Sequence, residues 1–499
     1  MAIALTEIRV RFDGQGSGEG ELTWGQMGIW RASQRNGKTM NLVWPLPLPG
    51  GTPLAEIVAM LRFMVSRHPA LRTRLHFVDG PSGERYPRQV VAESGEVPLH
   101  IVDIDDGEDP VAAAEELRSR YELTWFDYEN EFPVRMGVIR QSATLKQLVV
   151  GYSHVMVDGG GLEALDQDVK KHLDRVTGQP TAPPEGPNPL DLARKQGGPA
   201  ARRQSERAVQ YWADQLERLP ASQHQEPVSP HEPRFAELVV YSPAMELAMR
   251  AVGARTGADG TAVLLAAYSA AVARVFGRNP SVAQLVVSNR FRPGLADIVS
   301  QVSQHGICVV DAADASFDEI VARAQKAATT ASFYAYYDPL ACDRLLEEMA
   351  ARRGEPLDIF WCLNDRRAMT GLADGDPPTE AEITRVLPHT KLYWDRKEPA
   401  SDGALFLHVD SYPVLVDRQG LTEGLPAVYM QVWADTRHFT LDQVEALARE
   451  MEAVVTGAAR RPPRLRGQST FSALLSSKKL VFPPLTSVPM NLTVMVWPM

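Results

Sequence analysis

The spacing of apolar residues predicts a mixture of helices and strands. Apolar side chains recur every three or four positions over residues 53–67 and 261–276, which predicts two amphipathic helices. Short apolar runs predict strands at residues 134–139, 145–152 and 235–241. Because both halves of the chain mix the two kinds of element, the pattern favours an α/β fold with α+β layers.

Short polar patterns predict where later helices begin. Ser316 with Glu319, and Thr440 with Gln443, have the residue types of a capping box, in which side chains three positions apart bind free backbone N–H groups. Ser205 is a single-residue candidate cap. We expect a helix after each of them.

A segment rich in proline and glycine divides the chain, whose 499 residues fit two to three domains. The predicted division is a first lobe over residues 1–180, a crossover linker over 181–204 and a second lobe over 205–465. Residues 466–499 form an atypical apolar tail interrupted by prolines, which disfavours a membrane-spanning helix there.

The composition argues against several classes of protein. A net charge of −10 disfavours nucleic-acid binding, which needs clustered Lys and Arg. The three cysteines form no Cys-x-x-Cys pair, and so few thiols favour a reducing compartment such as the cytoplasm. No run of 18 apolar residues predicts a membrane span, and the N-terminal apolar run is too short for a signal peptide.

One short stretch combines residue types that catalysis uses. His154 and Asp158 follow the strand predicted over 145–152, and a glycine cluster at residues 159–161 comes next. A neutral imidazole can take a proton from an amine or hydroxyl group near pH 7. We expect Asp158 to pair with an arginine and hold the loop, while the amide of Gly159 can donate to an oxyanion.

Three other interpretations of this stretch stay open. A histidine in a turn is often only structural. A metal site is disfavoured because no nearby His or Cys supplies a third ligand beside His154 and Asp158. A serine hydrolase using Ser153 is disfavoured because neighbouring residues on a strand point to opposite faces, and no Gly-x-Ser-x-Gly motif occurs.

The wider sequence resembles the condensation domains of nonribosomal peptide synthetases, whose signature is His-His-x-x-x-Asp-Gly. They belong to the superfamily of chloramphenicol acetyltransferase. Residues 22–30 (LTWGQMGIW), 67–75 (RHPALRTRL) and 289–295 (NRFRPGL) are similar to three further motifs of that family, in the same order. Residues 360–364 and the predicted last helix also fit in position, so the resemblance covers about residues 20–460.

The resemblance implies two chloramphenicol-acetyltransferase-like lobes in a V-shaped pseudo-dimer, with the active histidine where they meet. It implies an acyltransferase of natural-product biosynthesis that joins a carrier-bound acyl or aminoacyl thioester to an amine or hydroxyl acceptor. His154 would act as general base or orient the nucleophile. No cofactor of the chain's own is expected, because a partner acyl or peptidyl carrier protein would bring its phosphopantetheine arm in trans.

The resemblance also implies supporting residues. Arg290 is the expected ion-pair partner of Asp158, and Arg292 is the second choice. Ser153 stands where the family has its first, mainly structural, histidine, and Arg72 belongs to a family motif expected to support the site. The expected lining of the substrate tunnel is Trp24, Gln304, His305 and Asn364.

Two other functions stay open. One is a coenzyme-A-dependent O-acyltransferase of the same superfamily, disfavoured because the Asp-Phe-Gly-Trp-Gly and Asn-Val-Pro-Gly-Pro motifs of two such branches are absent. The other is a non-catalytic recruitment module, disfavoured because His154 is present. A transfer assay would distinguish these functions, because transfer could need a carrier-bound thioester, could occur from coenzyme A, or could be absent.

Overall fold

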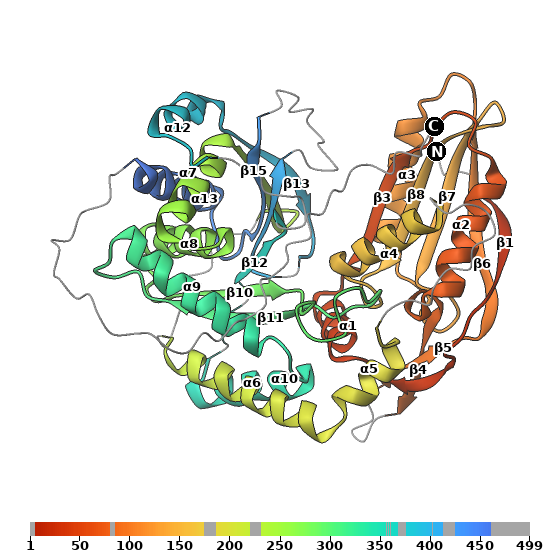
Figure 1. Ribbon diagram of the computed structural model, residues 1–499, viewed down its shortest axis with the longest axis horizontal. Coiled ribbons are helices and arrows are strands. Elements are labelled where there is room, and N and C mark those ends of the chain that lie inside the picture. Colours follow the sequence, from red (N-terminus) through yellow and green to blue (C-terminus); the bar gives the residue numbers. More distant parts are fainter. Residues whose placement is uncertain are drawn as a thin grey trace.

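The computed structural model forms two lobes that lie side by side, each built from a sheet and helices (Figure 1). Within the residues that the structure describes, the strands form sheets of five, seven and three members. The structure describes residues 5–79, 85–173, 186–219, 231–355, 357, 359, 361–367, 376–401, 403–412 and 425–460.

The first lobe is organised around the five-stranded sheet, in the order β1-β6-β7-β8-β3. Only the pair of β6 and β7 is parallel. Helices α2 (Leu54–Arg67) and α4 (Gly159–Leu173) bury their apolar faces on one side of this sheet, and α3 (Pro110–Leu123) covers the other. The strands are β1 (Thr6–Asp13), β3 (Asn41–Pro47), β6 (Ser94–Ile104), β7 (Val134–Gln141) and β8 (Thr144–Ser153).

A small sheet lies beside the connection to the second lobe. Its order is β2-β5-β4. On β5 the buried Gln89 donates a hydrogen bond to the carbonyl of Pro189 in α5, at 3.2 Å. The elements of this region are β2 (Gly18–Glu21), α1 (Trp24–Asn36), η1 (Pro69–Arg72), β4 (Thr73–Asp79), β5 (Arg85–Val91) and α5 (Pro189–Gln196).

The second lobe is built on the seven-stranded sheet, in the order β11-β10-β12-β14-β15-β9-β13. Its strands are β9 (Phe235–Ser242), β10 (Ser281–Val287), β11 (Gln304–Val310), β12 (Trp361–Asp365), β13 (Lys391–Glu398), β14 (Leu405–Tyr412) and β15 (Ala427–Asp435). Its helices are α6 (Pro199–Glu217), α7 (Pro243–Thr256), α8 (Gly260–Phe276), α9 (Phe317–Tyr334), α10 (Pro339–Arg353), α12 (Glu380–Val386), η2 (Leu387–His389) and α13 (Leu441–Ala459).

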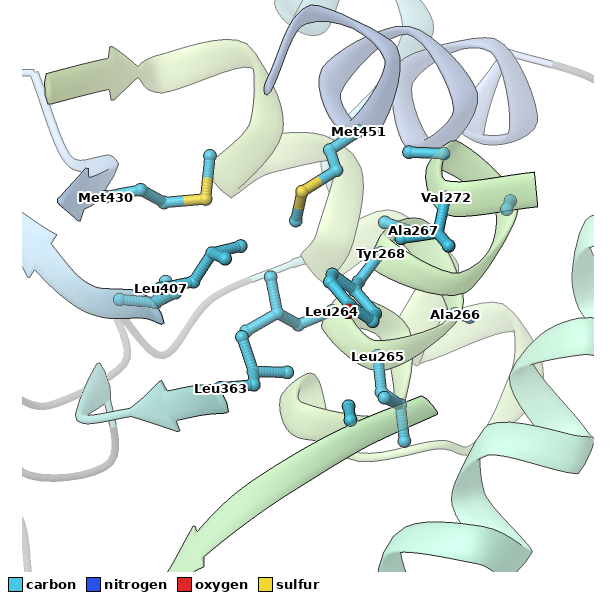
Figure 2. Packing of buried hydrophobic residues seen from close by; sticks show 14 of the residues in the cluster. Leu264, Leu265, Ala266, Ala267, Tyr268, Val272, Leu363, Leu407, Met430 and Met451 are labelled. Atoms are coloured by element: carbon cyan, nitrogen blue, oxygen red, sulfur yellow. The ribbon is translucent and has the colours of Figure 1, made fainter. Parts of the chain in front are cut away.

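The core of the second lobe uses one face of this sheet. Figure 2 shows Leu363, Leu407 and Met430 pointing from the strands toward Tyr268 of α8 and Met451 of α13. Successive side chains on a strand point to opposite faces, so their neighbours point away from these helices. In Figure 1 that opposite face lies on the side of the second lobe nearer to the first lobe.

Most elements predicted from apolar spacing are present. The two amphipathic helices are α2 and α8, and the three strands are β7, β8 and β9. Both capping boxes are formed, by Ser316 with Glu319 at the start of α9 and by Thr440 with Gln443 at the start of α13. Local sequence therefore determines where these helices begin.

The segment between the lobes is more helical than its proline content suggests. Helix α5 and the first turns of α6 lie within residues 186–204, the described part of the predicted linker. The prediction that Ser205 caps a helix is wrong, because α6 already begins at Pro199, and proline is tolerated in the first turn. The buried Ser205 Oγ instead accepts a hydrogen bond from the backbone N–H of Asp338, at 2.9 Å.

The predicted tail, residues 466–499, lies outside the described residues. Within the described part of the chain, no single helix has both the length and the apolar character needed to cross a membrane. By length and composition only, α7 and α8 pass such a test together, as a pair bent by 110°.

Candidate active site

His154 occupies a tight turn between the end of β8 and the start of α4. The strand ends at Ser153, and the backbone N–H of Met156 donates to the carbonyl of Ser153 at 3.0 Å. Val155, Met156 and Val157 are buried, which anchors the turn, whereas His154 is half-buried. The turn therefore holds a partly accessible imidazole on a rigid support.

A hydrogen bond within the turn determines which nitrogen of His154 is available. Nδ1 lies 2.9 Å from the carbonyl oxygen of Val157. Because a carbonyl only accepts, Nδ1 carries the hydrogen in the neutral ring, and Nε2 carries the lone pair. Nε2 is thus the nitrogen that can accept a proton.

Asp158 does not contact the imidazole but connects the two lobes. Its Oδ1 accepts hydrogen bonds from the backbone N–H of Gly161, at 2.7 Å, and from Arg290. Its Oδ2 accepts from the backbone N–H groups of Val302 and Ser303, both at 2.9 Å, and from Ser303 Oγ at 2.8 Å. Four of these five hydrogen bonds come from the second lobe.

The charge of Asp158 is stabilised despite complete burial. Burial opposes ionisation, but the guanidinium of Arg290 and the backbone N–H of Val302 outweigh it and lower the pKa of this carboxyl group. Arg290 also donates to the carbonyl oxygens of Leu295 and Ile298, which fixes the guanidinium in place. The expected ion pair of Asp158 with Arg290 is therefore present.

Arg292, the second choice for that pair, has other partners. Its Nε donates to Asn289 Oδ1 at 2.9 Å, and its Nη2 donates to the carbonyl of Phe333 at 2.8 Å. Its guanidinium also lies over the ring of Tyr336, 4.7 Å from the centroid. Arg292 therefore holds the loop after β10 against the end of α9.

Ser153 has a specific partner in the first lobe. Its Oγ lies 2.9 Å from the hydroxyl of Tyr128, and both side chains are buried. Burial raises the pKa of Tyr128 to about 12. A neutral hydroxyl pair therefore occupies the position of the family's first histidine.

The backbones of the two lobes come close together near the turn, at Gly25 and at Gly161. A Cβ on Gly25 of α1 would lie 2.5 Å from the carbonyl oxygen of Gln301, and one on Gly161 would lie 2.9 Å from that of Ser300. Real Cβ atoms do not approach that closely. Glycine at both positions therefore permits the contact between lobes.

Three of the expected residues are buried and make structural contacts. Arg72 is buried and donates to the carbonyls of Gln15 and Ala92, so it supports the first lobe. Trp24 is buried against the ring of Tyr336, with centroids 4.9 Å apart. Gln304 is buried, and its amide donates to the carbonyl of Tyr337 at 2.8 Å.

The seven-stranded sheet brings two further histidines near His154. Burial, together with the charges of Arg35 and His154, lowers the pKa of His305 to about 4. His408 on β14 also has a lowered pKa, caused first by burial and then by cations, among them His154. Asn364, expected in the tunnel lining, lies beside His408, with its Nδ2 3.3 Å from His408 Nδ1.

We call the sheet face that carries Asn364, Arg366, His408, Gln431 and Arg396 the inter-lobe face. The sequence prediction missed His408, although the signal was available. Leu405, Leu407 and Val409 alternate with His408 and Asp410, and period-two alternation predicts a strand with one polar face. What that polar face meets cannot be deduced from the alternation alone.

The comparison with known families decides the class of the protein. The family model of the condensation domain matches residues 17–351. The chain belongs to the condensation-domain family. This condensation domain is similar to the nonribosomal peptide synthetase kk1B of Curvularia clavata, with 26% identity over 330 residues. The match covers 63% of this chain and 2% of that much longer protein.

Two solved condensation domains share the fold. The one that mediates chain release from the enacyloxin polyketide synthase has a TM-score of 0.65 and 18% identity, covering 93% of this chain and 86% of that one. The one from the Monacolin K polyketide synthase MokA has a TM-score of 0.68 and 15% identity, covering 89% and 98%. The predicted α/β fold with two chloramphenicol-acetyltransferase-like lobes is confirmed.

The site of this condensation domain combines a proton acceptor with a rigid support. Condensation domains catalyse acyl transfer or amide formation in nonribosomal peptide and polyketide synthesis, and they work with carrier protein domains. Nε2 of His154 carries an available lone pair, and Asp158 accepts a hydrogen bond from the helix that starts after it. Among the described residues, no three His, Cys, Asp or Glu side chains are grouped to hold a metal ion.

Proposed function

We propose that the chain acts as a condensation enzyme. It joins a carrier-bound acyl or aminoacyl thioester to an amine or hydroxyl acceptor, and His154 is the general base. The hydrogen bond from Nδ1 of His154 to Val157 carries this proposal, because it leaves Nε2 as a proton acceptor. A carrier protein supplies the phosphopantetheine arm in trans, and the enzyme needs no cofactor of its own.

The proposed step moves one proton and one acyl group. Nε2 accepts a proton from the acceptor as its nitrogen or oxygen attacks the thioester carbon. The C–S bond then breaks, and the departing sulfur takes up the proton from His154. The products are an amide or an ester and the free thiol of the carrier arm, so the imidazole returns to its starting form.

Asp158 and Arg290 have a positioning role in this mechanism. Asp158 accepts a hydrogen bond from Gly161 in the first turn of α4, so the ion pair with Arg290 fixes that helix against the second lobe. The amide of Gly159, which is exposed at the start of the same helix, is the candidate donor to the oxyanion.

Two substitutions of His154 test the base. His154→Ala should lower the rate of acyl transfer from a hexanoyl-loaded carrier protein at least about 100-fold. His154→Asn should lower it equally, because its amide can donate to Val157 as Nδ1 does but lacks an acceptor in place of Nε2. His76→Ala, on the exposed surface of β4, is the control and should leave the rate unchanged. A fully active His154→Asn variant would exclude His154 as the base.

The choice of thioester tests the proposed partner. Transfer from a hexanoyl-loaded carrier protein should exceed transfer from hexanoyl coenzyme A. Equal rates would favour a coenzyme-A-dependent acyltransferase. Absence of transfer with both donors, over a panel of amine and hydroxyl acceptors, would favour a recruitment module.

A further inference from the structure

The inter-lobe face carries charged side chains where the other face of the sheet is apolar. On β14, Leu407 and Val409 are buried in the core, while His408 and Asp410 belong to the opposite face. Arg366 binds Asp410 through two nitrogens, with Nε at 2.9 Å and Nη2 at 2.6 Å. A polar row on a sheet face costs desolvation and adds little stability, so it calls for another explanation.

The charged pairs continue across the sheet to the first lobe. Arg366 also donates to Gln431 at 3.3 Å, and Gln431 donates to Glu237 at 2.7 Å. Glu237 accepts from Arg396 at 2.7 Å. Beyond it, Lys38 of the first lobe donates to Glu398 at 2.6 Å and lies over the ring of Trp433. The inter-lobe face is therefore a connected network that both lobes complete.

In the two arginine pairs, the cation is the more accessible partner. Arg366 and Arg396 keep 32% and 26% of their side-chain surface exposed, whereas Asp410 and Glu237 keep 12% and 0%. The carboxylates thus lie deeper than the guanidinium groups. The accessible partner of each pair on this face is therefore the cation.

Two hydrogen-bond donors remain available beside each other on this face. Nη1 of Arg366 makes no hydrogen bond with any of the residues that the structure describes. The amide nitrogen of Asn364 donates to Nδ1 of His408, which leaves the hydrogen of the neutral ring on Nε2. Nε2 of His408 is thus a hydrogen-bond donor, whereas Nε2 of His154 is an acceptor.

The electrostatic environment of His408 agrees with this geometry. Burial lowers its pKa most, and the charges of Arg366, Lys38, Arg396 and His154 lower it further. The ring therefore stays neutral near pH 7 and donates through Nε2. Cations and neutral donors on one surface suit an acceptor group that carries negative charge.

We infer that the inter-lobe face binds a carboxylate group of a substrate, held by Arg366 and His408. This inference rests on the proposed function, since it names a property of the molecule that reacts near His154. A carboxylate can accept from a guanidinium and an imidazole at once, with bonds stronger than those of a neutral amide. The carboxylate belongs either to the acceptor or to the far end of the acyl chain.

Calorimetric titration with glutarate and glutaramide tests the binding, because these probes differ only in their charged ends. The unmodified protein should bind glutarate at least about 10-fold more tightly than glutaramide at low salt. In the double variant Arg366→Gln/Asp410→Asn the ratio should fall below about 3-fold. Changing both partners avoids an unpaired buried charge, so this variant should still fold.

A matched control removes an arginine pair elsewhere in the same lobe. Arg255 of α7 binds Asp318 of α9 through two nitrogens, on the helical side of the sheet. Arg255→Gln/Asp318→Asn should keep the full preference for glutarate. Equal binding of both probes by the unmodified protein, or an unchanged preference in the Arg366 double variant, would overturn the inference.

Transfer assays identify the source of the carboxylate. One arm compares a glutaryl with a glutaramoyl donor on a carrier protein, and the other compares β-alanine with β-alaninamide as acceptor. A preference for the acid in one arm assigns the carboxylate to that substrate. No preference in either arm would show that the bound anion is not a substrate group, which contradicts the inference.

These experiments separate failure of the inference from failure of the proposed function. Glutarate binding is an equilibrium that does not need transfer, so His154→Ala should keep it. Normal transfer by His154→Ala would refute the base while leaving the binding result intact. Conversely, His154→Ala could be inactive in transfer while neither the unmodified protein nor any variant prefers glutarate over glutaramide. That pair of results would refute only the inference.

Discussion

Asp158 and the inter-lobe face both place charges between the lobes, but they differ in how much bonding capacity is already used. The carboxylate of Asp158 accepts five hydrogen bonds and is 2% exposed. Arg366, in contrast, is half-buried and keeps one nitrogen without a partner among the described residues. The bonding capacity of Asp158 is used within the protein, whereas Arg366 keeps a donor for the carboxylate group that we infer.

The difference indicates how support and recognition are divided. Removing one partner of a buried pair leaves an unpaired charge, which is costly to stability. Removing a partly exposed cation costs less, because water solvates what remains. Substitutions at Asp158 should therefore affect folding and rate together, and substitutions on the inter-lobe face should affect mainly substrate preference.

The largest effect is expected from Asp158→Ala. It leaves Arg290 without its carboxylate and removes the Asp158 acceptor from the backbone N–H groups of Val302 and Ser303. The free energy of unfolding should fall by about 3–5 kcal/mol, with transfer lowered as well. Urea unfolding at pH 7 measures it, with Asp103→Ala, from an exposed pair with Arg140, as a control that should cost less than about 1 kcal/mol. Equal stability of Asp158→Ala and the unmodified protein would contradict the supporting role.

A smaller effect is expected from Gly25→Ala in α1. Its Cβ would lie 2.5 Å from the carbonyl oxygen of Gln301, so the lobes must separate or the helix must shift. We expect a loss of about 1–3 kcal/mol in thermal or urea unfolding. Gly28→Ala is the matched control on the same helix, where a Cβ meets nothing within 4 Å. It should be neutral or stabilising by up to about 1 kcal/mol, because alanine favours helix. Identical effects of the two substitutions would show that the lobes do not meet tightly here.

The smallest effect at pH 7 is expected from His305, whose titration changes stability only at lower pH. Burial, with the charges of Arg35 and His154, lowers the pKa of His305 from 6.5 to about 4. The unfolded chain therefore takes up this proton first, and stability is lost as the pH falls from about 6.5 to about 4. The lowered pKa of Asp158 contributes stability above pH 3.8, which is lost only at lower pH.

His305→Gln separates these two pH windows. It should reduce the slope of the unfolding free energy against pH, between pH 6.5 and 4, by an amount equivalent to up to about one bound proton. The loss of stability below pH 3.8 should stay unchanged. Urea unfolding at a series of pH values measures both slopes. A variant with the slope of the unmodified protein between pH 6.5 and 4 would mean that His305 titrates normally in the folded state.

Much of the support could be predicted from the sequence, because local rules determine it. Apolar residues at helical spacing, Leu162, Leu165, Val169 and Leu173, predict the helix after the glycine cluster. Its start at Gly159 places Gly161 where it can donate to Asp158. The pair of Asp158 with Arg290 followed from the order of family motifs. Arg72 shows the limit of that approach, because the family motif does not indicate that its guanidinium binds the carbonyls of residues 15 and 92.

The inter-lobe face could not be predicted, because its contacts join residues far apart in sequence. Lys38 binds Glu398, and Glu237 binds Arg396, across more than 150 positions in each case. Alternation along β14 indicates that His408 and Asp410 share a face, but one sequence does not tell which lobe that face meets. Only the packing of the lobes determines this.

The hydrogen bond from Nδ1 of His154 to Val157 has a consequence for inhibitor chemistry. A reversible inhibitor directed at this imidazole should present a hydrogen-bond donor, such as a sulfonamide N–H, because Nε2 offers a lone pair. A ketone or ether oxygen at the same place could form no hydrogen bond, because its lone pair would repel the lone pair of Nε2. Rotating the ring to offer the other nitrogen would sacrifice the bond to Val157, so the turn itself selects the compounds that fit.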